Sequence, residues 1–321
     1  MRVARKSRRA RFELESLDSR CLLSPVVEPQ PFQPTAISLT LNARTVPPDP
    51  YPVNHPQAAN NSYYGLYPGT LYGPSGKPLY TDVHQGAIGD CWLMASLADA
   101  AARDPQLIAQ MFTPLGAYIE GGVQVQLWRV EFNNNPRDTV IVDNEFPTYQ
   151  TGPAANHPIY DQIYVSVLWV ALAEKAYVEA AGMGYVQANN QGLVGDTYSA
   201  VDGGQPAWAL EAITGKHAYC YTTNTSAITS VTSAGNNAAD LVVLATGAKT
   251  TSTSLVPDHC YAVINDTGPS QYPFTVYNPW GEGAYTTWTN PSDKRAYTVF
   301  GATFYCNTAF VAQNFGWYIC S

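Results

Sequence analysis

The chain has 321 residues, of which 13% are charged, and its formal net charge is −8 at pH 7. Residues 1–11 hold six of the 17 basic residues, so 11 basic residues face 25 acidic ones in the remainder. That acidic remainder argues against nucleic acid as a partner. No run of 18 apolar residues occurs, so the sequence predicts no membrane-spanning helix.

Two segments precede the predicted folded domain. Residues 1–24 are basic and then mixed, without the apolar stretch of an ordinary secretory signal. Their pattern is similar to an N-terminal segment of bacterial surface and exported proteins; a basic tail of no assigned use is the alternative. We therefore expect an extracellular or cell-surface location, with the cytoplasm as the alternative. Residues 25–60 are rich in proline and predict a linker or a propeptide.

A loop and helix at residues 85–103 carry the first candidate catalytic residue, Cys91. The loop includes two glycines, which allow a tight turn. Asp90 is a favourable N-cap for a helix over residues 91–103, and Pro105 would close this helical stretch. Cys91 then lies in the first turn, where free N–H groups and the helix dipole favour the reactive thiolate. A buried structural cysteine is the alternative.

The middle of the chain predicts a hairpin followed by a buried helix. Residues 123–130 alternate as a strand and are expected to pair with residues 139–142. Residues 163–181 are apolar on nearly every face, which is typical of a buried helix. Within it, we expect Glu174 and Lys175 to be structural polar anchors.

A short helix over residues 207–213 should end at Gly215, after which β-forming residues become frequent. This change predicts a boundary between a helical lobe (61–215) and a β-rich lobe (216–321). The candidate strands of the second lobe are residues 218–222, 241–246, 259–264, 274–277, 297–299 and 315–319.

A base for Cys91 must come from five histidines, and His259 has the most informative surroundings. It opens one strand-like run, and a second run ends at Asn278, with Gly268 and Pro269 between them. In an antiparallel hairpin centred on that turn, His259 and Asn278 are equidistant from the turn and therefore neighbours. Polar residues that only cap strand ends are the alternative.

Three segments together carry a family pattern. They are Gln-Gly-Ala-Ile-Gly-Asp-Cys-Trp-Leu-Met-Ala-Ser-Leu at 85–97, Asp-His-Cys-Tyr-Ala-Val at 258–263 and Tyr-Asn-Pro-Trp-Gly at 277–281. They resemble the active-site motifs of the calpain-type cysteine peptidases, and the resemblance extends over about residues 70–315. It implies that Cys91 is the nucleophile, His259 the general base, Asn278 the residue that orients the imidazole and Gln85 the oxyanion-hole donor.

The departures from the family pattern leave every catalytic position filled. Asp258 stands where the family usually has glycine, Cys260 where it usually has alanine, and Tyr277 where it often has arginine.

The resemblance implies an α+β, papain-like fold with two lobes and a substrate cleft between them. Trp92, Gly203, Gly204 and Trp280 are the expected cleft residues; for Trp280, ordinary core packing is the alternative. The expected function is that of a cysteine endopeptidase that cleaves proteins or peptides through a thioester acyl-enzyme. A thiol acyltransferase of transglutaminase type and a non-catalytic binding module are the alternatives.

We expect no required cofactor and no metal ligand among the site residues, although animal members of the family need Ca²⁺. The sequence has no EF-hand loop of the Asp-x-Asp-x-Asp-Gly type. Glu282 and Asp293 are the only acids after Asn278, so the calcium site of the β-rich lobe is predicted to be weak or absent. In the helical lobe, Asp90, Asp196 and Asp202 are candidate calcium ligands, although Asp90 is better explained as an N-cap and Asp202 as a turn residue.

The other cysteines give weaker signals. Cys306 and Cys320 flank a possible terminal hairpin and could form a disulfide in an exported protein. His217 and Cys220 have the spacing of half a zinc site, but a structural reading is favoured because no second half is evident.

Overall fold

The computed structural model describes residues 55–58, 62–152, 154–161, 163, 166–189, 197–223, 240–269, 271–281, 286–289, 294 and 296–321. All of them belong to one compact unit, Thr45–Ser321. The predictions for residues 1–24, and for most of 25–60, concern parts of the chain outside the described residues. None of the described helices combines the length and the hydrophobicity needed to span a bilayer.

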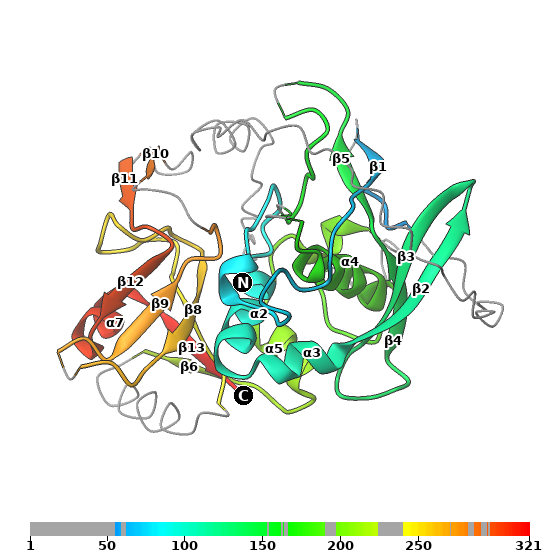
Figure 1. Cartoon of the computed structure of the whole chain (residues 1–321). Helices are drawn as coiled ribbons and strands as arrows, with labels where there is room; N and C mark the ends of the chain where they lie inside the picture. The colour runs from blue at the N-terminus through cyan, green and yellow to red at the C-terminus, as the bar shows by residue number, and fades with distance from the viewer. Residues whose placement is uncertain are drawn as a thin grey trace, which may run out of the picture. The chain divides into compact units, whose positions relative to one another are not determined.

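The fold mixes helices with antiparallel sheets (Figure 1). The α-helices are α2 (Cys91–Arg103), α3 (Pro105–Met111), α4 (Trp169–Gly182), α5 (Pro206–Thr214) and α7 (Thr308–Asn314). The strands before α4 are β1 (Ser62–Leu66), β2 (Phe112–Glu120), β3 (Val123–Glu131), β4 (Thr139–Asp143) and β5 (Glu145–Tyr149). The strands after α5 are β6 (Tyr219–Thr222), β7 (Val242–Ala245), β8 (Cys260–Asn265), β9 (Phe274–Tyr277), β10 (Thr286–Thr289), β11 (Ala296–Val299), β12 (Thr303–Cys306) and β13 (Trp317–Cys320).

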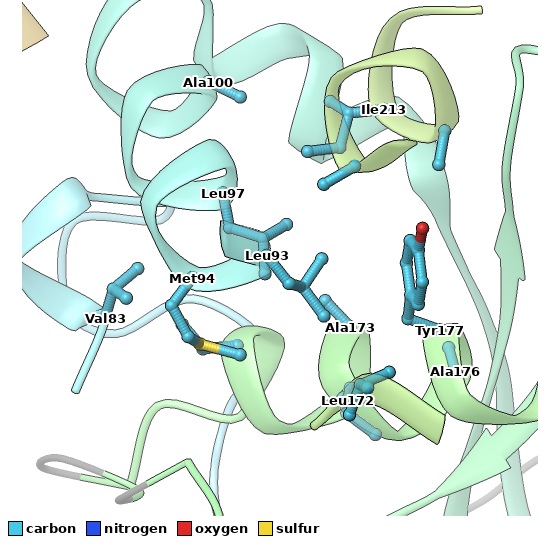
Figure 2. Close-up of a cluster of buried hydrophobic side chains, with 14 of the residues drawn as sticks. Val83, Leu93, Met94, Leu97, Ala100, Leu172, Ala173, Ala176, Tyr177 and Ile213 are labelled. Carbon is cyan, nitrogen blue, oxygen red and sulfur yellow. The ribbon is translucent and has the colours of Figure 1, made fainter. Parts of the chain in front are cut away.

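Helix α2 is the central element of the core and has the predicted bounds. It is rich in alanine and leucine, which form helices readily, and it contacts α5 on one side and β7 and β8 on the other. Figure 2 shows Leu93 and Leu97 of α2 between Leu172 of α4 and Ile213 of α5. Because three sides are covered, every residue from Cys91 to Ala101 is buried.

Helix α2 ends at Arg103, just before Pro105, as predicted. Pro105 also opens a second helix, α3, at its first position, which was not predicted. The side chain of Asp104 accepts a hydrogen bond from Gln106 N and caps this new helix. Proline suits that position because the first helical N–H has no intrahelical partner in any case.

The predicted hairpin is confirmed, since β3 and β4 pair antiparallel in a three-stranded sheet ordered β2-β3-β4. Strands β2, β1 and β5 were not predicted, so the part before Gly215 holds more sheet than the sequence suggests. The buried helix begins at Trp169 rather than at residue 163. Val167 instead forms a bridge with Thr70, an extended arrangement that suits a β-branched residue.

The second half of the chain builds a six-stranded antiparallel sheet in the order β12-β9-β8-β7-β13-β6. Helix α5 ends at Thr214 as predicted, and Gly215 adopts the left-handed C-cap with φ 67°. Five of the six candidate strands overlap this sheet, whereas β12 and α7 were not predicted. The sixth candidate, residues 297–299, pairs with β10 in a separate two-stranded sheet.

The hairpin of β8 and β9 differs in register from the predicted one. Ala262 pairs with Tyr277, so the register is displaced by two residues, and a bulge lies between Val263 and Asn265. His259 therefore lies just before β8 and Asn278 just after β9. Their side chains still meet, because each residue leaves the hairpin at the same end.

Cys306 and Cys320 are both free thiols, so the possible disulfide between them does not form. Cys306 ends β12 and Cys320 ends β13, and three strands lie between these two in the sheet. Strand spacing puts them about 19 Å apart, whereas disulfide formation needs Cα atoms within about 7 Å.

Candidate active site

Cys91 is the first residue of α2 and is 9% exposed. Asp90 precedes it at the N-cap position, but in the described structure its carboxyl group caps no helical N–H. The carboxyl group instead accepts a hydrogen bond from Gln85 Nε2 at 3.1 Å and lies close to the Glu174 carboxyl group. The capping role predicted for Asp90 was therefore wrong, because a buried carboxyl group is bonded to partners inside the core.

His259 is fixed from both its backbone and its ring. Its N–H donates to Thr246 Oγ1 at 2.9 Å, and the Thr246 N–H donates to the His259 carbonyl at 2.9 Å. The ring atom Nε2 lies 2.9 Å from Asn278 Oδ1. Because an amide oxygen only accepts, this bond puts a proton on Nε2. The imidazole thus keeps its other nitrogen, Nδ1, for the hydrogen bond that it forms with Cys91.

Trp280 covers the bond between His259 and Asn278. Its ring centroid lies 5.0 Å from that of the imidazole, and its backbone N–H donates to Asn278 Oδ1 at 3.1 Å. Tyr261 approaches the imidazole edge-on from another side, with 4.9 Å between ring centroids. The base is therefore held by neutral groups and is 4% exposed.

The surroundings of Cys91 favour its thiolate. A hydrogen bond from the Cys260 thiol, followed by the charge and hydrogen bond of His259, holds the pKa of Cys91 well below its usual range, although burial opposes this. Cys260 responds in the opposite sense: the neighbouring Cys91 sulfur and burial raise the pKa of the Cys260 thiol well above its usual range. Cys91 is thus the anionic member of the two-thiol pair, and Cys260 is the protonated one.

Asp258 explains one departure from the family pattern. It has φ 50°, in the left-handed region that favours glycine and that aspartate tolerates better than most residues. Its N–H donates to the Gly247 carbonyl at 3.0 Å, which fixes this conformation directly before His259. Burial, together with the nearby Cys91 charge, raises the pKa of the Asp258 carboxyl.

The side-chain amide of Gln85 is bonded within the loop that leads to Cys91. Gln85 Nε2 donates to the Ile88 carbonyl at 2.7 Å and to Asp90 Oδ1 at 3.1 Å. Both amide protons are therefore used within the loop. The Oε1 atom is buried and has no hydrogen-bond partner among the described residues.

A group of buried carboxyl groups lies behind this loop. Asp161 Oδ1 accepts from His84 N at 3.3 Å, and Glu174 Oε2 accepts from Asp161 N at 2.9 Å. Burial raises the pKa of Asp90, Asp161 and Glu174 well above their usual ranges. The nearby Cys91 charge adds to the effect on Asp90, and the neighbouring carboxyl groups add to it for Asp161 and Glu174. The structural anchor predicted at Glu174 is confirmed, but its closeness to Asp90 and the Gln85 loop was not predicted.

The loop before Cys91 is attached directly to the end of β9. Gln85 N donates to the Pro279 carbonyl at 2.8 Å, and the Tyr277 hydroxyl donates to the Val83 carbonyl at 2.8 Å. Gly281 (φ 81°) lies so close to the His84 ring that a side chain there would overlap it. These contacts fix the segment that carries the nucleophile against the segment that carries Asn278.

The loop glycines serve close approach rather than a tight turn. A side chain at Gly86 would overlap the Tyr160 carbonyl, and one at Gly89 would lie 2.6 Å from Asp202 Oδ1. Gly203 N donates to the Gly89 carbonyl at 2.9 Å, so residues 202–204 lie beside the loop.

The four predicted cleft residues differ in exposure. Trp92 is 1% exposed, so it belongs to the core and presents no cleft surface. Its Nε1 donates to the Val201 carbonyl at 3.0 Å, and its ring lies directly against Gly204. Trp92 thus supports the Gly203 and Gly204 segment from beneath, while Trp280 is partly exposed.

One described cluster outside the catalytic residues has side chains of the kind that bind metals. His55, Glu120, Asp143 and Glu145 offer ligand atoms that lie within 4.8 Å of one another. Lys175 Nζ, however, already bonds Asp143 Oδ1 at 2.9 Å. Of the acids considered for calcium, Asp90 and Asp202 are engaged with the active-site loop. Asp196, Glu282 and Asp293 lie outside the described residues.

His217 does not approach a metal-binding geometry with Cys220. Its Nδ1 pairs with Glu211 Oε1 at 2.6 Å on an exposed surface, while Cys220 is exposed on β6. This arrangement agrees with the structural reading of the pair.

Comparison with known proteins identifies the family. The model of the calpain family cysteine protease matches residues 75–296. The calpain-2 catalytic subunit of Gallus gallus is 27% identical over 229 residues, which are 66% of this chain and 29% of that protein. For the calpain-1 catalytic subunit of Sus scrofa, the identity is 27% over 233 residues, with coverages of 67% and 29%. Calpain clp-4 of Caenorhabditis elegans is 31% identical over 143 residues, with coverages of 42% and 16%.

The chain therefore belongs to the calpain family of cysteine proteases and carries a domain of the cysteine-type endopeptidase class. It spans less than a third of the length of these relatives.

Proposed function

We propose that this protein is an endopeptidase that hydrolyses peptide bonds in proteins through Cys91, His259 and Asn278. The observation that carries the proposal is one continuous set of hydrogen bonds. The Cys91 thiol bonds to the His259 ring, and the opposite ring nitrogen lies 2.9 Å from Asn278 Oδ1. A nucleophile, a base and an orienting group in this order are the requirements for thiol-based acyl transfer. Papain-like lobes would place the substrate at the N-terminal end of α2, where Cys91 lies near His259 at the start of β8.

The first half of the proposed reaction forms an acyl-enzyme. His259 takes the Cys91 proton, and the thiolate attacks the scissile carbonyl carbon to give a tetrahedral oxyanion. The backbone N–H of Cys91, at the first position of α2, is free of intrahelical bonding and can donate to that oxyanion. The intermediate collapses when protonated His259 gives its proton to the leaving amine, and a thioester remains on Cys91.

The second half restores the enzyme. His259 removes a proton from water, and the resulting hydroxide attacks the thioester carbonyl. The carboxylic acid product leaves, and Cys91 returns as the thiolate beside protonated His259. Asn278 keeps the ring orientation through both halves, and Trp280 shields the bond between Asn278 and His259 from water.

Gln85 requires a rearrangement to serve as the second oxyanion donor. Its bond to the Ile88 carbonyl is a backbone contact that the substrate oxyanion could replace, while the bond to Asp90 keeps the amide in the site. Asp90 and Glu174 would then act as positioning residues for Gln85. A typical oxyanion contact of this kind stabilises the transition state by about 3 kcal/mol.

The test is labelling with a thiol-reactive peptidyl epoxide, read by mass spectrometry with and without Ca²⁺. We expect one adduct on Cys91 that needs no added Ca²⁺, with Cys306→Ala labelled like the wild type and Cys91→Ala unlabelled. Product analysis with a peptide and an added amine should give the free acid. Labelling of another cysteine, or an amide as the main product, would reject the proposal.

We further propose that the protein requires no cofactor, that protein or peptide chains are its substrates, and that it acts outside the cell. The calcium expectation rests on the few acids after Asn278. Peptidase activity should therefore survive EGTA. Activity that collapses in EGTA and returns with micromolar Ca²⁺ would show that calcium regulates this chain.

A further inference from the structure

A second thiol lies directly beside the nucleophile. Cys260 is the first residue of β8, Cys91 is the first residue of α2, and these two elements pack on one another. The two residues are 7% and 9% exposed. Their side chains are hydrogen-bonded, and both are free thiols.

The peptidase mechanism gives Cys260 no task that needs sulfur. A thiol there adds one chemical possibility that alanine lacks, which is a covalent bond to the neighbouring sulfur. The other described cysteines lack this proximity: Cys306 lies on β12, and Cys220 and Cys320 lie on β6 and β13.

We propose that Cys91 and Cys260 form a site of reversible oxidation, at which hydrogen peroxide converts the two thiols into a disulfide and switches the peptidase off. This proposal rests on the proposed function only in naming Cys91 as the nucleophile. Hydrogen peroxide is the oxidant, and it is small enough to reach two nearly buried sulfur atoms.

The chemistry proceeds in two balanced steps. The Cys91 thiolate attacks one peroxide oxygen, the O–O bond breaks, and protonated His259 gives its proton to the departing hydroxide, so that Cys91 becomes a sulfenic acid and one water leaves. The Cys260 sulfur then attacks the sulfenic sulfur, loses its proton, and displaces the hydroxyl group as a second water. Two electrons pass from the two thiols to the peroxide. A dithiol such as dithiothreitol reverses the change by taking up the same two electrons.

The electrostatics of the pair assign the two steps to different residues. Cys91 is the thiolate and reacts first with peroxide, because the thiolate is the nucleophilic form. Cys260 stays protonated beside that negative charge. Once Cys91 is a neutral sulfenic acid, the charge that kept Cys260 protonated is gone, and the second sulfur is already adjacent. Disulfide formation then competes with further oxidation of Cys91, which cannot be reversed by dithiothreitol.

The experiment compares the full chain with Cys260→Ala, Cys260→Ser and the control Cys306→Ala, each shown to be folded by circular dichroism. Each protein is reduced, treated with hydrogen peroxide, freed of peroxide with catalase and then treated with dithiothreitol. Peptidase activity is recorded at every stage relative to the untreated sample of the same protein. A non-reduced digest is analysed by mass spectrometry for a linked pair of peptides.

We expect peroxide to inactivate all four proteins. Dithiothreitol should restore most activity to the wild type and to Cys306→Ala, and their non-reduced digests should contain Cys91 linked to Cys260. Both Cys260 variants should stay inactive, with Cys91 in the sulfinic form. The proposal is overturned if the linked peptide is absent from the wild type, or if the Cys260 variants recover as fully as the wild type.

The two proposals fail in different ways. If the peptidase proposal is wrong, the reduced and untreated wild type lacks peptidase activity, while the linked peptide still reports whether the disulfide forms. If only the oxidation proposal is wrong, the untreated enzyme is active and the linked peptide is missing.

Discussion

The loop before Cys91 rests on buried carboxyl groups, whereas His259 is held by an amide, a hydroxyl and an indole ring. On the first side, Gln85 bonds to Asp90, Asp90 lies close to Glu174, and both acids have a pKa raised by burial. On the second side, Asn278, Thr246 and Trp280 carry no charge that titrates. Titratable carboxyl groups thus support the loop before Cys91, whereas neutral groups hold His259.

The two supports should therefore respond differently to pH. The hydrogen bonds with Asn278 and Thr246 that hold His259 should not change with pH, because these partners are neutral. The support of the nucleophile depends on protons shared among buried acids, so its stability should change with pH. The predictions below test whether the two supports can be perturbed independently.

The largest expected effects come from the catalytic pair itself. Cys91→Ala and His259→Ala should each lower kcat on the order of 10⁶-fold, because nucleophile and base act as one unit. Asn278→Ala should cost less than His259→Ala, since the base remains in place. Steady-state kinetics on a peptide substrate measure these losses, with Cys306→Ala as the control. Equal losses of kcat in Asn278→Ala and His259→Ala would contradict the view that Asn278 only orients the His259 ring.

Gln85→Ala should lower turnover by about 100-fold to 1,000-fold if its amide donates to the oxyanion. The loss should fall on kcat rather than on KM, because the contact forms only in the transition state. Gln85→Glu is the matched control for size, since a carboxylate cannot donate. Unchanged turnover in Gln85→Ala would leave Gln85 with only the loop contacts that it makes in the structure.

Glu174→Gln tests the buried acids. Burial raises the folded-state pKa of Glu174 above its ordinary value of 4.5. The unfolded chain therefore loses this proton first, and stability is lost as pH rises through the folded-state pKa. Glutamine resembles the protonated form, so the variant should lose less stability between pH 5 and pH 8, on the order of 1–3 kcal/mol.

Urea denaturation at several pH values measures that difference, with the partly exposed Glu131→Gln on β3 as the control. Parallel curves for the wild type and Glu174→Gln would mean that Glu174 does not hold a proton in the folded protein.

The smallest expected effects concern Asp258, directly before the base. Asp258→Gly removes the strain of φ 50° but adds freedom to the unfolded chain, so stability should change by no more than about 1 kcal/mol. Both Asp258→Gly and Asp258→Asn remove a negative charge near Cys91 and should lower the Cys91 thiol pKa further. Alkylation rates across pH measure this shift. An unchanged rate profile in both variants would show that the Asp258 charge does not act on Cys91.

The sequence predicted features that depend on local signals. The bounds of α2 followed from a helix-forming run, and the meeting of His259 with Asn278 followed from hairpin symmetry despite a register displaced by two residues. The order of the six-stranded sheet depends on contacts between distant strands, which no local pattern encodes. The same holds for the buried carboxyl groups: Asp90 has the sequence signature of an N-cap, and only its burial beside Glu174 turns it inward.

The contact between Cys91 and Cys260 belongs to this second group. Cys260 stood out in the sequence only as a departure from alanine, and its place beside the nucleophile follows from the packing of β8 on α2. Contacts between residues on different helices and strands are therefore the features that the sequence alone does not predict.

The central claim is that Cys91 is a thiolate because of its contacts with Cys260 and with His259, and the pH dependence of Cys91 alkylation by iodoacetamide tests the contribution of His259 most directly. In the wild type, Cys91 should react rapidly below neutral pH, because its thiol pKa lies well below the usual range for cysteine. In His259→Ala, the profile should move towards the ordinary cysteine value of about 8.5. The claim is contradicted if Cys91 reacts no faster than Cys306 at about pH 6, or if His259→Ala leaves the profile unchanged.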